Sequence, residues 1–342
     1  ALLDGALAGL EWLSAEAVDL MARAAARAFR DRWERCGSDG DAWRSLLAPD
    51  AVSAARHALR SWSAGLPVRG LRPDGDTTSM VAVDRDGRAV SFIHSLAFTF
   101  GARLTIPGTG IVLNNRLGRG AYLVEGHPNA VRPRRRPLHT LNAWLATDEA
   151  GRLLHVGNTP GGDGQVQWNM QILSHLADHG LDPQRAVSAP RFTISPGSDA
   201  NMIGAPAELA CESRLGAATI ASLRTLGHTV RETGPWAAGG SALVISADEA
   251  RGVLAGGADP RQDGVVLGDW RQPARVASSA GPLLDTCLKL TVYIACTPGL
   301  PGTPWSPTGR PRRFSGCPAR ASPRAPRSAS PASRRVPRSR SS

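Results

Sequence analysis

Lysine and paired cysteines are what this chain of 342 residues most conspicuously lacks. It has 40 basic residues, of which only Lys289 is a lysine, and its five cysteines form no CxxC pair. Cysteines scattered in this way match neither a disulfide framework nor the ligand spacing of a zinc site. No apolar run in the sequence is long enough to cross a membrane. These absences argue against disulfide scaffolds, zinc modules and helical membrane proteins.

Acidic residues are absent from 301–342, which holds ten arginines, nine prolines and nine serines. Those ten arginines supply ten of the eleven units of net charge, so 1–300 carry only +1. A nearly neutral folded part gives no reason to expect a nucleic acid partner. A segment this poor in apolar residues cannot offset its ordering entropy, so we predict that 269–342 form a disordered, low-complexity tail. An arginine-rich arm that binds nucleic acid or membrane phosphates is the alternative.

The first predicted helix begins after Ser14, a capping residue, and places Glu16 in its first turn. Apolar residues then recur at three- and four-residue steps, as in an amphipathic helix with one buried stripe: Val18, Met21, Ala25, Phe29 and Trp33. A second helix is predicted over 52–62. A loop rich in glycine, proline and arginine follows over 65–75.

A β-hairpin is the clearest element of the sequence. Alternating apolar residues over 77–84 and 89–96 suit two paired strands, and Gly87 accepts the positive φ of the tight turn between them. The sequence also predicts hairpins at 142–147 with 153–157 and at 241–246 with 251–255, strands at 111–113 and 206–213, helices from 164, from 182 and over 216–226, and a surface loop over 116–137. This mixture indicates a layered α+β domain.

Nine short motifs follow the loop at 65–75 in a set order. They are Asp76-Thr77-Thr78, 84–91, Phe100-Gly101, 107–116, 126–130, 136–142, 160–165, 189–192 and 258–261. Their order resembles the small-subunit core of the gamma-glutamyltransferase (gamma-glutamyltranspeptidase) family of N-terminal-nucleophile hydrolases. The resemblance covers roughly 15–265. The motifs at 136–142 and 160–165 look most like the oxamate amidohydrolase and acylase-like branch.

The resemblance implies a four-layer αββα sandwich, here partial. It assigns 1–76 as a remnant of the C-terminal part of the large subunit and 77–268 as the nucleophile domain, followed by the tail at 269–342. Family precursors carry several hundred residues before the nucleophile, so we expect an N-terminal truncation and exposed sheet surface. The sequence starts at Ala1 without Met or a signal-like segment, so a targeting peptide could be missing from it; the compartment stays undecided, with the cytoplasm slightly favoured over the periplasm or secretion.

The resemblance also implies the chemistry. The Thr77 hydroxyl would attack the carbonyl of Asp76, and hydrolysis of the resulting ester would leave Thr77 as a new N-terminus. Its free amine would then act as the general base. Gly161 and Gly162 resemble the oxyanion hole, in which two backbone N–H groups face the developing charge. Thr78 is the competing nucleophile, and no metal or organic cofactor is implied.

Substrate contacts are implied for Ser95, His139 and Thr140. The family's second threonine falls at Ser95, and its pair of serines falls at His139-Thr140; for His139 an ordinary loop histidine is the alternative. The aspartate that holds the substrate α-amine falls near Gly118 and Arg119, where an arginine would repel an ammonium group. The partner would be a small gamma-glutamyl or related amide, together with the chain's own cleaved N-terminal piece or a separate large-subunit-like chain.

Two alternatives stay open. The chain could be an inactive remnant, or a subunit that acts only by association with a partner. His175 and His179 lie one helical turn apart, a spacing that can bind zinc, but the HExxH motif requires glutamate where this chain has Leu176. We therefore predict that these histidines lie on a solvated helix face.

Overall fold

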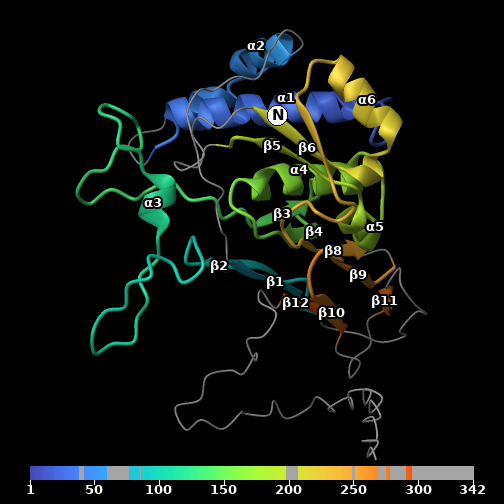
Figure 1. The fold of residues 1–342 in the computed structure, drawn as a ribbon. Helices are drawn as coiled ribbons and strands as arrows, with labels where there is room; N and C mark the ends of the chain where they lie inside the picture. The colour runs from blue at the N-terminus through green and yellow to red at the C-terminus, as the bar shows by residue number, and fades with distance from the viewer. Residues whose placement is uncertain are drawn as a thin grey trace, which may run out of the picture. The chain divides into compact units, whose positions relative to one another are not determined.

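A computed structural model describes residues 1–37, 42–59, 77–84, 86–197, 207–248 and 251–268, and the backbone of 275–277 and 290–294. Its described strands form three sheets, of four, five and three strands. The two larger sheets pack face to face, helices cover the far side of the five-stranded sheet, and the small sheet lies beyond those helices (Figure 1). This is the predicted α+β sandwich, seen in part.

The N-terminal helices agree with the sequence. Helix α1 (Ala15–Arg35) begins where predicted, and the hydroxyl of its cap Ser14 accepts a hydrogen bond of 3.2 Å from Ala17 N. A 3₁₀ helix, η1 (Ala42–Leu47), leads to α2 (Pro49–Leu59). Helix α2 starts three residues before the predicted Val52 because Pro49 suits the first turn of a helix. The loop at 65–75 lies outside the described residues.

The four-stranded sheet contains the predicted hairpin, β1 (Thr77–Val83) and β2 (Ala89–Ser95). Its strand order is β10-β12-β1-β2, with β10 at Gly264–Gly268 and β12 at Leu290–Ile294. Strand β12 pairs antiparallel with both β1 and β10.

Two short strands, β11 (Arg275–Ala277) and β12, fall within 269–342, for which the sequence predicts a disordered tail; the disorder of this segment as a whole stays a prediction. Leu-Thr-Val-Tyr-Ile at 290–294 is rich in β-branched and aromatic residues, a local pattern that the surrounding composition concealed. The remainder of 269–342 lies outside the described residues.

The five-stranded sheet has the order β11-β9-β8-β4-β3. It contains both further predicted hairpins: β3 (Trp144–Thr147) with β4 (Leu153–Asn158), and β8 (Leu243–Asp248) with β9 (Val253–Ala258). Val81 and Val83 of the first sheet form a buried cluster with three side chains of the second: Val156, Leu243 and Ile245. Burial of this apolar surface holds the two sheets together.

Helices α4 (Gly164–Ala177) and α5 (Pro183–Ser188) cover the other face of the five-stranded sheet. Beyond them lies the small sheet, ordered β5-β6-β7, with β5 at Phe192–Ser195, β6 at Glu208–Glu212 and β7 at Val230–Thr233. Helix α1 packs on this sheet together with η2 (Ser213–Leu215) and α6 (Ala217–Thr225) (Figure 1). No helix in the described part of the chain is both long and apolar enough to span a membrane.

The predicted strand at 111–113 is wrong. This stretch makes one isolated bridge, between Val112 and Thr105, and the side chains of Ile111 and Leu113 are exposed. The loop predicted over 116–137 begins with a short helix, α3 (Arg116–Gly120), which stands beside the layers (Figure 1). Helix α3 carries two of the side chains that organise the site.

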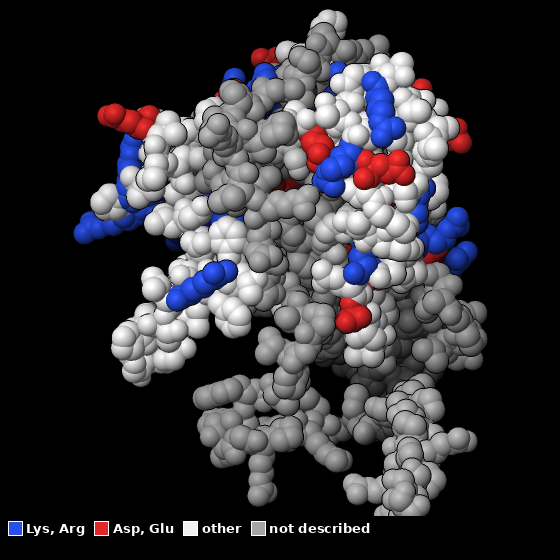
Figure 2. All heavy atoms as spheres, viewed as in Figure 1, with Lys and Arg blue, Asp and Glu red and all other residues white. Residues whose placement is uncertain are grey.

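The outer face of the four-stranded sheet is apolar and open. Val90 and Phe92 of β2 are 49% and 47% exposed, and Val265 and Leu267 of β10 are similarly exposed. Charged side chains elsewhere are of mixed sign: Figure 2 shows basic and acidic groups interspersed on the face it displays. This agrees with the net charge of +1 on 1–300.

Candidate active site

Thr77, the proposed nucleophile, is the first residue of β1 and lies opposite Ser95 in the hairpin. Its Oγ1 donates a hydrogen bond of 2.9 Å to Ser95 Oγ, which also accepts one of 2.9 Å from Ala97 N. The side chain of Thr77 is half-buried, whereas that of Thr78 is exposed. Thr77 is therefore the less exposed of the two threonines. Asp76, the other side of the proposed cleavage site, lies outside the described residues.

Asn158 ties this hairpin to the strand that leads to the glycine pair. It ends β4, is fully buried, and its Nδ2 donates to Met80 O at 3.0 Å and to Ser91 Oγ at 2.9 Å. Thr159-Pro160 then connects β4 to Gly161 and Gly162. The two stacked sheets thus hold Thr77 and the glycine pair in one framework.

Gly161 and Gly162 occupy conformations that favour glycine, with φ of 131° and 58°. A Cβ on Gly161 would overlap the ring of Trp168, and one on Gly162 would lie 2.5 Å from Arg119 Nη2. Their carbonyls accept hydrogen bonds from Gly164 N and Gln165 N, which start α4. Neither glycine N–H donates to a protein acceptor in the described part of the chain. An oxyanion hole requires such N–H groups, because they must donate to the charge that develops on the substrate.

Trp168 packs directly against the glycine pair. Its ring fills the space next to Gly161, Gly164, Gly239 and Gly240, and its Nε1 donates to Thr193 Oγ1 at 2.9 Å. A side chain on any of these four glycines would collide with the ring. The glycines are therefore required by the close approach of the indole.

A buried ion network supports Trp168 from the far side. It joins the motifs at 189–192 and 258–261: Arg191 pairs with Asp259 at 2.5 Å, and Arg261 pairs with Asp259 at 3.0 Å and with Glu212 at 2.6 Å. Burial lowers the pKa of Arg191 to about 10, which still leaves it charged near neutral pH. Its guanidinium lies 5.9 Å from the centre of the Trp168 ring. These two motifs are thus structural supports.

Arg119 connects the threonine to the glycine pair. This side chain from α3 is 5% exposed, its Nη1 donates to Ala97 O at 2.8 Å, and its guanidinium lies 4.8 Å from the centre of the Phe98 ring. Its other nitrogen contacts Gly162. The sequence marked Arg119 as a departure from the family pattern but gave no signal that it would bridge the two halves of the site.

His139 and Thr140, predicted as substrate contacts, lie next to two arginines. Thr140 Oγ1 accepts a hydrogen bond of 3.1 Å from Arg116 Nη1, and His139 O accepts one of 3.0 Å from Arg32 Nη2. Arg32 also pairs with Asp163 Oδ1 at 3.0 Å, immediately after the glycine pair. Burial, then Arg116 and Arg32, lower the pKa of His139. The surroundings of this imidazole therefore disfavour positive charge.

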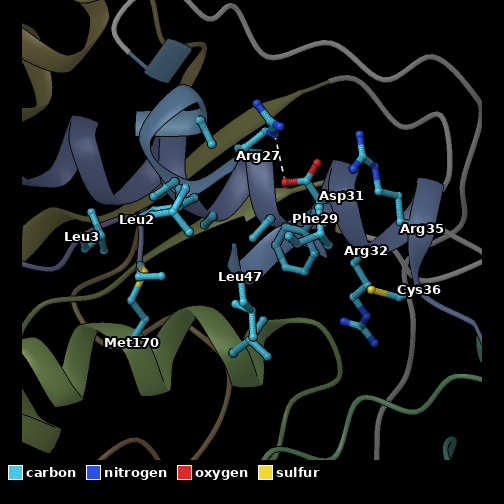
Figure 3. A pocket seen from close by; sticks show the side chains of 18 of the residues that line it. Leu2, Leu3, Arg27, Phe29, Asp31, Arg32, Arg35, Cys36, Leu47 and Met170 are labelled. Carbon is cyan, nitrogen blue, oxygen red and sulfur yellow. Dashed lines mark hydrogen bonds and ion pairs between the residues drawn. The ribbon is translucent and has the colours of Figure 1, made fainter. Parts of the chain in front are cut away.

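His139 and Thr140 also line a cavity of about 1000 Å³ between α1, η1, α2 and α4. Figure 3 shows Phe29, Leu47 and Met170 around it, with Arg32 at one side and the Arg27–Asp31 ion pair of 2.9 Å nearby. Thr77 and the glycine pair do not line this cavity. The described structure thus brings Thr77, Ser95 and Gly162 together through Arg119, and places His139 and Thr140 on a neighbouring hollow.

His175 corrects the prediction of a solvated histidine pair. It is 1% exposed, and its Nδ1 accepts a hydrogen bond of 3.1 Å from Trp12 Nε1. Burial, with the positive fields of His179 and Arg191, lowers its pKa to about 3. No group of three or more potential metal ligands occurs among the described residues.

Comparison with known proteins identifies a matching family and several relatives. A family model described as gamma-glutamyltranspeptidase matches residues 3–269. A glutathione hydrolase-like proenzyme of Bacillus subtilis is 40% identical over 199 residues, 58% of this chain and 37% of the relative. An oxamate amidohydrolase proenzyme of Klebsiella pneumoniae is 35% identical over 231 residues, 66% of this chain and 41% of the relative.

Among solved structures, a cephalosporin acylase from Bacillus halodurans matches with a TM-score of 0.63 at 27% identity. The match covers 80% of this chain and 47% of that one. The chain therefore spans less than half the length of each of these three relatives.

Proposed function

The chain belongs to the gamma-glutamyltranspeptidase family. We propose that it is an enzyme that cleaves amide bonds and transfers the acyl group to water or an amine, with the Thr77 hydroxyl as its nucleophile. The observation that carries this proposal is the 2.9 Å hydrogen bond from Thr77 Oγ1 to Ser95 Oγ at the start of β1. This hydrogen bond orients the hydroxyl of Thr77, the first residue of β1, and β1 itself lies between β12 and β2 in the sheet. Arg119 then links this pair, through Ala97, to Gly162.

The first reaction is cleavage of the chain itself. Thr77 Oγ1 bonds to the carbonyl carbon of Asp76, and the Asp76–Thr77 peptide bond breaks. The hydroxyl proton passes to the departing nitrogen, which becomes the α-amine of Thr77, and an ester joins Asp76 to Thr77 Oγ1. Water hydrolyses this ester. The products are a C-terminal carboxylate on Asp76 and a free hydroxyl and amine on Thr77.

The second reaction uses the new amine as the base. Its reference pKa is near 8, so at neutral pH a small fraction is free to accept the hydroxyl proton as Thr77 attacks a substrate amide. The N–H groups of Gly161 and Gly162 stabilise the tetrahedral oxyanion. The substrate amine leaves with the proton, and water or a second amine takes the acyl group from Thr77.

The names of the relatives support the proposed substrate class. Those reported above are named for hydrolysis of glutathione, hydrolysis of oxamate, and removal of an acyl group from a cephalosporin. We propose a gamma-glutamyl or related amide, with Ser95, His139 and Thr140 as its contacts. No cofactor enters these steps.

Intact mass spectrometry of the purified chain tests the nucleophile. Cleavage before Thr77 divides the 36.0 kDa chain into pieces of about 8 and 28 kDa. Thr77→Ala should stay whole, whereas Thr77→Ser keeps a hydroxyl and should still cleave. Thr78→Ala is the matched control and should cleave like the unaltered chain. A whole chain in every case would contradict self-cleavage.

The open outer face of the four-stranded sheet favours a second candidate, a subunit that acts only when associated with another chain. An apolar face of this kind is typical of a binding site for a partner, here a separate large-subunit-like chain, because the described part of the chain's own N-terminal piece packs on the small sheet. Cleavage that appears only after addition of such a chain would support this candidate.

A further inference from the structure

A serine and a histidine meet on the helix-covered side of the five-stranded sheet, outside the site described above. His155 of β4 lies directly opposite Ser246 of β8, and Ser246 Oγ is 2.7 Å from His155 Nδ1. Their strand neighbours Val156 and Ile245 belong to the buried cluster between the two larger sheets. Because successive side chains of a strand point to opposite faces, His155 and Ser246 point toward the helices. The paired strands thus hold the two groups at hydrogen-bond distance.

Both side chains line a cavity of about 980 Å³ at the ends of α4 and α5 that face each other along the chain. This volume is within the range of small-molecule sites. Leu176, Leu181 and Val253 contribute apolar wall to the cavity. Thr77 and the glycine pair are not among its lining residues. The serine and the histidine therefore face a space of their own, partly apolar and large enough for a small molecule.

The charged side chains that line this cavity already have partners. Arg152 pairs with Asp148 at 2.7 Å, and Arg251 pairs with Asp248 at 3.5 Å. Asp182 caps α5, because its Oδ1 accepts a hydrogen bond of 3.0 Å from a backbone N–H in the first turn of that helix. A charged ligand would have to compete with these interactions. The described lining therefore favours an uncharged molecule.

We propose that Ser246 is a second nucleophile of this chain, that His155 is its general base, and that the cavity admits small uncharged esters. Burial lowers the pKa of His155, so the imidazole is neutral near pH 7 and can take up a proton. With the proton of the neutral ring on Nε2, Nδ1 accepts the hydrogen bond from the Ser246 hydroxyl. A nucleophile beside a base is the arrangement that activates a serine.

The reaction moves the acyl group of the ester to Ser246. Its Oγ bonds to the carbonyl carbon, and the hydroxyl proton passes to His155 Nδ1. The bond to the leaving alcohol breaks, and the alcohol takes that proton. Water then attacks the acyl-serine while Nδ1 accepts a proton from it and passes this proton to the departing Ser246 Oγ. The products are a carboxylic acid, an alcohol and the original serine and histidine.

Diisopropyl fluorophosphate and p-nitrophenyl butyrate test the proposal. Both are small and uncharged, and the first forms a stable adduct with an activated serine. The full chain carries Thr77→Ala, so that the nucleophile proposed above cannot contribute. We expect peptide mass spectrometry to find the phosphoryl adduct on Ser246 and not on Ser45, an exposed serine whose hydroxyl bonds to Ala42 O. No adduct on Ser246, or equal modification of Ser45, would overturn the proposal.

Ser246→Ala and His155→Gln, each added to Thr77→Ala, test the two roles. Each should lower hydrolysis of p-nitrophenyl butyrate by on the order of 10²-fold, and His155→Gln should slow formation of the adduct on Ser246 by a similar factor. His94→Gln, at an exposed histidine of β2, is the control and should change neither rate. An unchanged rate of adduct formation in His155→Gln would contradict its role as the base.

The outcome does not depend on the proposal for Thr77. Every chain in this test carries Thr77→Ala, so an adduct on Ser246 supports the serine and histidine whether or not Thr77 cleaves the unaltered chain. Formation of the adduct requires no substitution at position 155 or 246, and it therefore decides the matter even if His155→Gln fails to fold. Urea denaturation reports whether each variant is folded under the conditions of the assay.

Discussion

At the scale of single residues, two independent features prevent any residue other than glycine at position 162 from fitting without strain. Its φ of 58° is one that residues with a Cβ rarely adopt, and Arg119 occupies the space where that Cβ would lie. The φ alone costs a substituted residue about 1 kcal/mol. The contact with Arg119 adds a displacement of the guanidinium, and with it of the hydrogen bond to Ala97 O.

We predict that Gly162→Ala abolishes self-cleavage at Thr77 while the chain still folds. Gly151→Ala is the matched control, because Gly151 has a φ of 78° but nothing within 4 Å of a Cβ. It should lose about 1 kcal/mol of unfolding free energy and cleave normally. Intact mass and urea denaturation measure the two effects. Normal cleavage of Gly162→Ala would show that the pair is an ordinary turn.

His175 makes stability depend on pH. Its folded pKa of about 3 lies below the value near 6.5 of an unfolded chain, so below about pH 6.5 the unfolded state binds a proton that the folded state does not. The contribution of neutral His175 to the unfolding free energy is therefore fully present above pH 6.5 and is lost progressively as the pH falls toward 3. Protonation of Nδ1 would also remove the acceptor for Trp12 Nε1.

His175→Gln should therefore be destabilising at pH 7 and less so at pH 5. The difference in unfolding free energy between variant and unaltered chain should shrink by up to about 1.4 kcal/mol for each pH unit over this range. Denaturant unfolding at both pH values measures it. His94→Gln, on the open face of β2, is the control; an equal change with pH in both variants would rule out His175 as the source.

Individual residues were predictable from the sequence where a local motif determined them. Thr77 and the Gly161-Gly162 pair are found from the order of short motifs, and their roles remain proposals. The burial of His175 was not predictable, because its hydrogen-bond partner Trp12 lies 163 residues earlier. The position of Arg119 against Gly162 depends in the same way on contacts between distant segments.

At the scale of elements, Asn158 joins two sheets with one side chain. Its Nδ2 bonds to Met80 O in β1 and to Ser91 Oγ in β2, while its own strand pairs with β8. Loss of the amide leaves the partly buried Met80 carbonyl without this donor, which costs about 1–3 kcal/mol.

We predict that Asn158→Ala lowers the unfolding free energy by about 2 kcal/mol and slows self-cleavage, because the hairpin with Thr77 and the strand leading to Gly161 lose their link. Ser91→Ala keeps the bond from Asn158 to Met80 O but removes both the bond from Asn158 and the 2.9 Å bond from Ser91 Oγ to Gly157 O, so it should destabilise the chain while slowing self-cleavage less. Urea denaturation and the time course of intact mass provide the comparison. A fully stable Asn158→Ala that cleaves at the normal rate would exclude this linking role.

The sequence predicted the long elements and missed several of the short ones. Helices α1 and α4 and the hairpin β1–β2 have clear periods and turn signals, and their bounds agree closely. Strands β5, β7 and β10, of four or five residues each, were not predicted. At this length a strand depends on its partners in the sheet rather than on its own pattern.

At the scale of the whole described structure, the exposed apolar face of the four-stranded sheet is the feature that most favours aggregation or self-association. Val90, Phe92, Val265 and Leu267 present a group of apolar side chains to water. Such a face promotes association with another surface.

We predict that the purified chain associates with itself as its concentration rises, and that Val90→Lys with Phe92→Lys suppresses this. Both side chains point outward, so the change should alter the unfolding free energy by less than about 1 kcal/mol. Sedimentation velocity over a concentration series measures the association. Leu123→Lys, at a leucine 95% exposed outside the sheets, is the control and should leave it unchanged. Monomers at all concentrations would show that the face is not adhesive.

The place of β12 bears on how the chain is made. Strand β1 ends at Val83 and its partner β12 ends at Ile294, so 211 residues separate the two during translation. At about 5–20 residues per second, a ribosome needs roughly 10–40 s to cover that distance. Throughout that interval the strand that begins with Thr77 has one bare edge. The nascent hairpin is thus a substrate for chaperones well before its sheet can be completed.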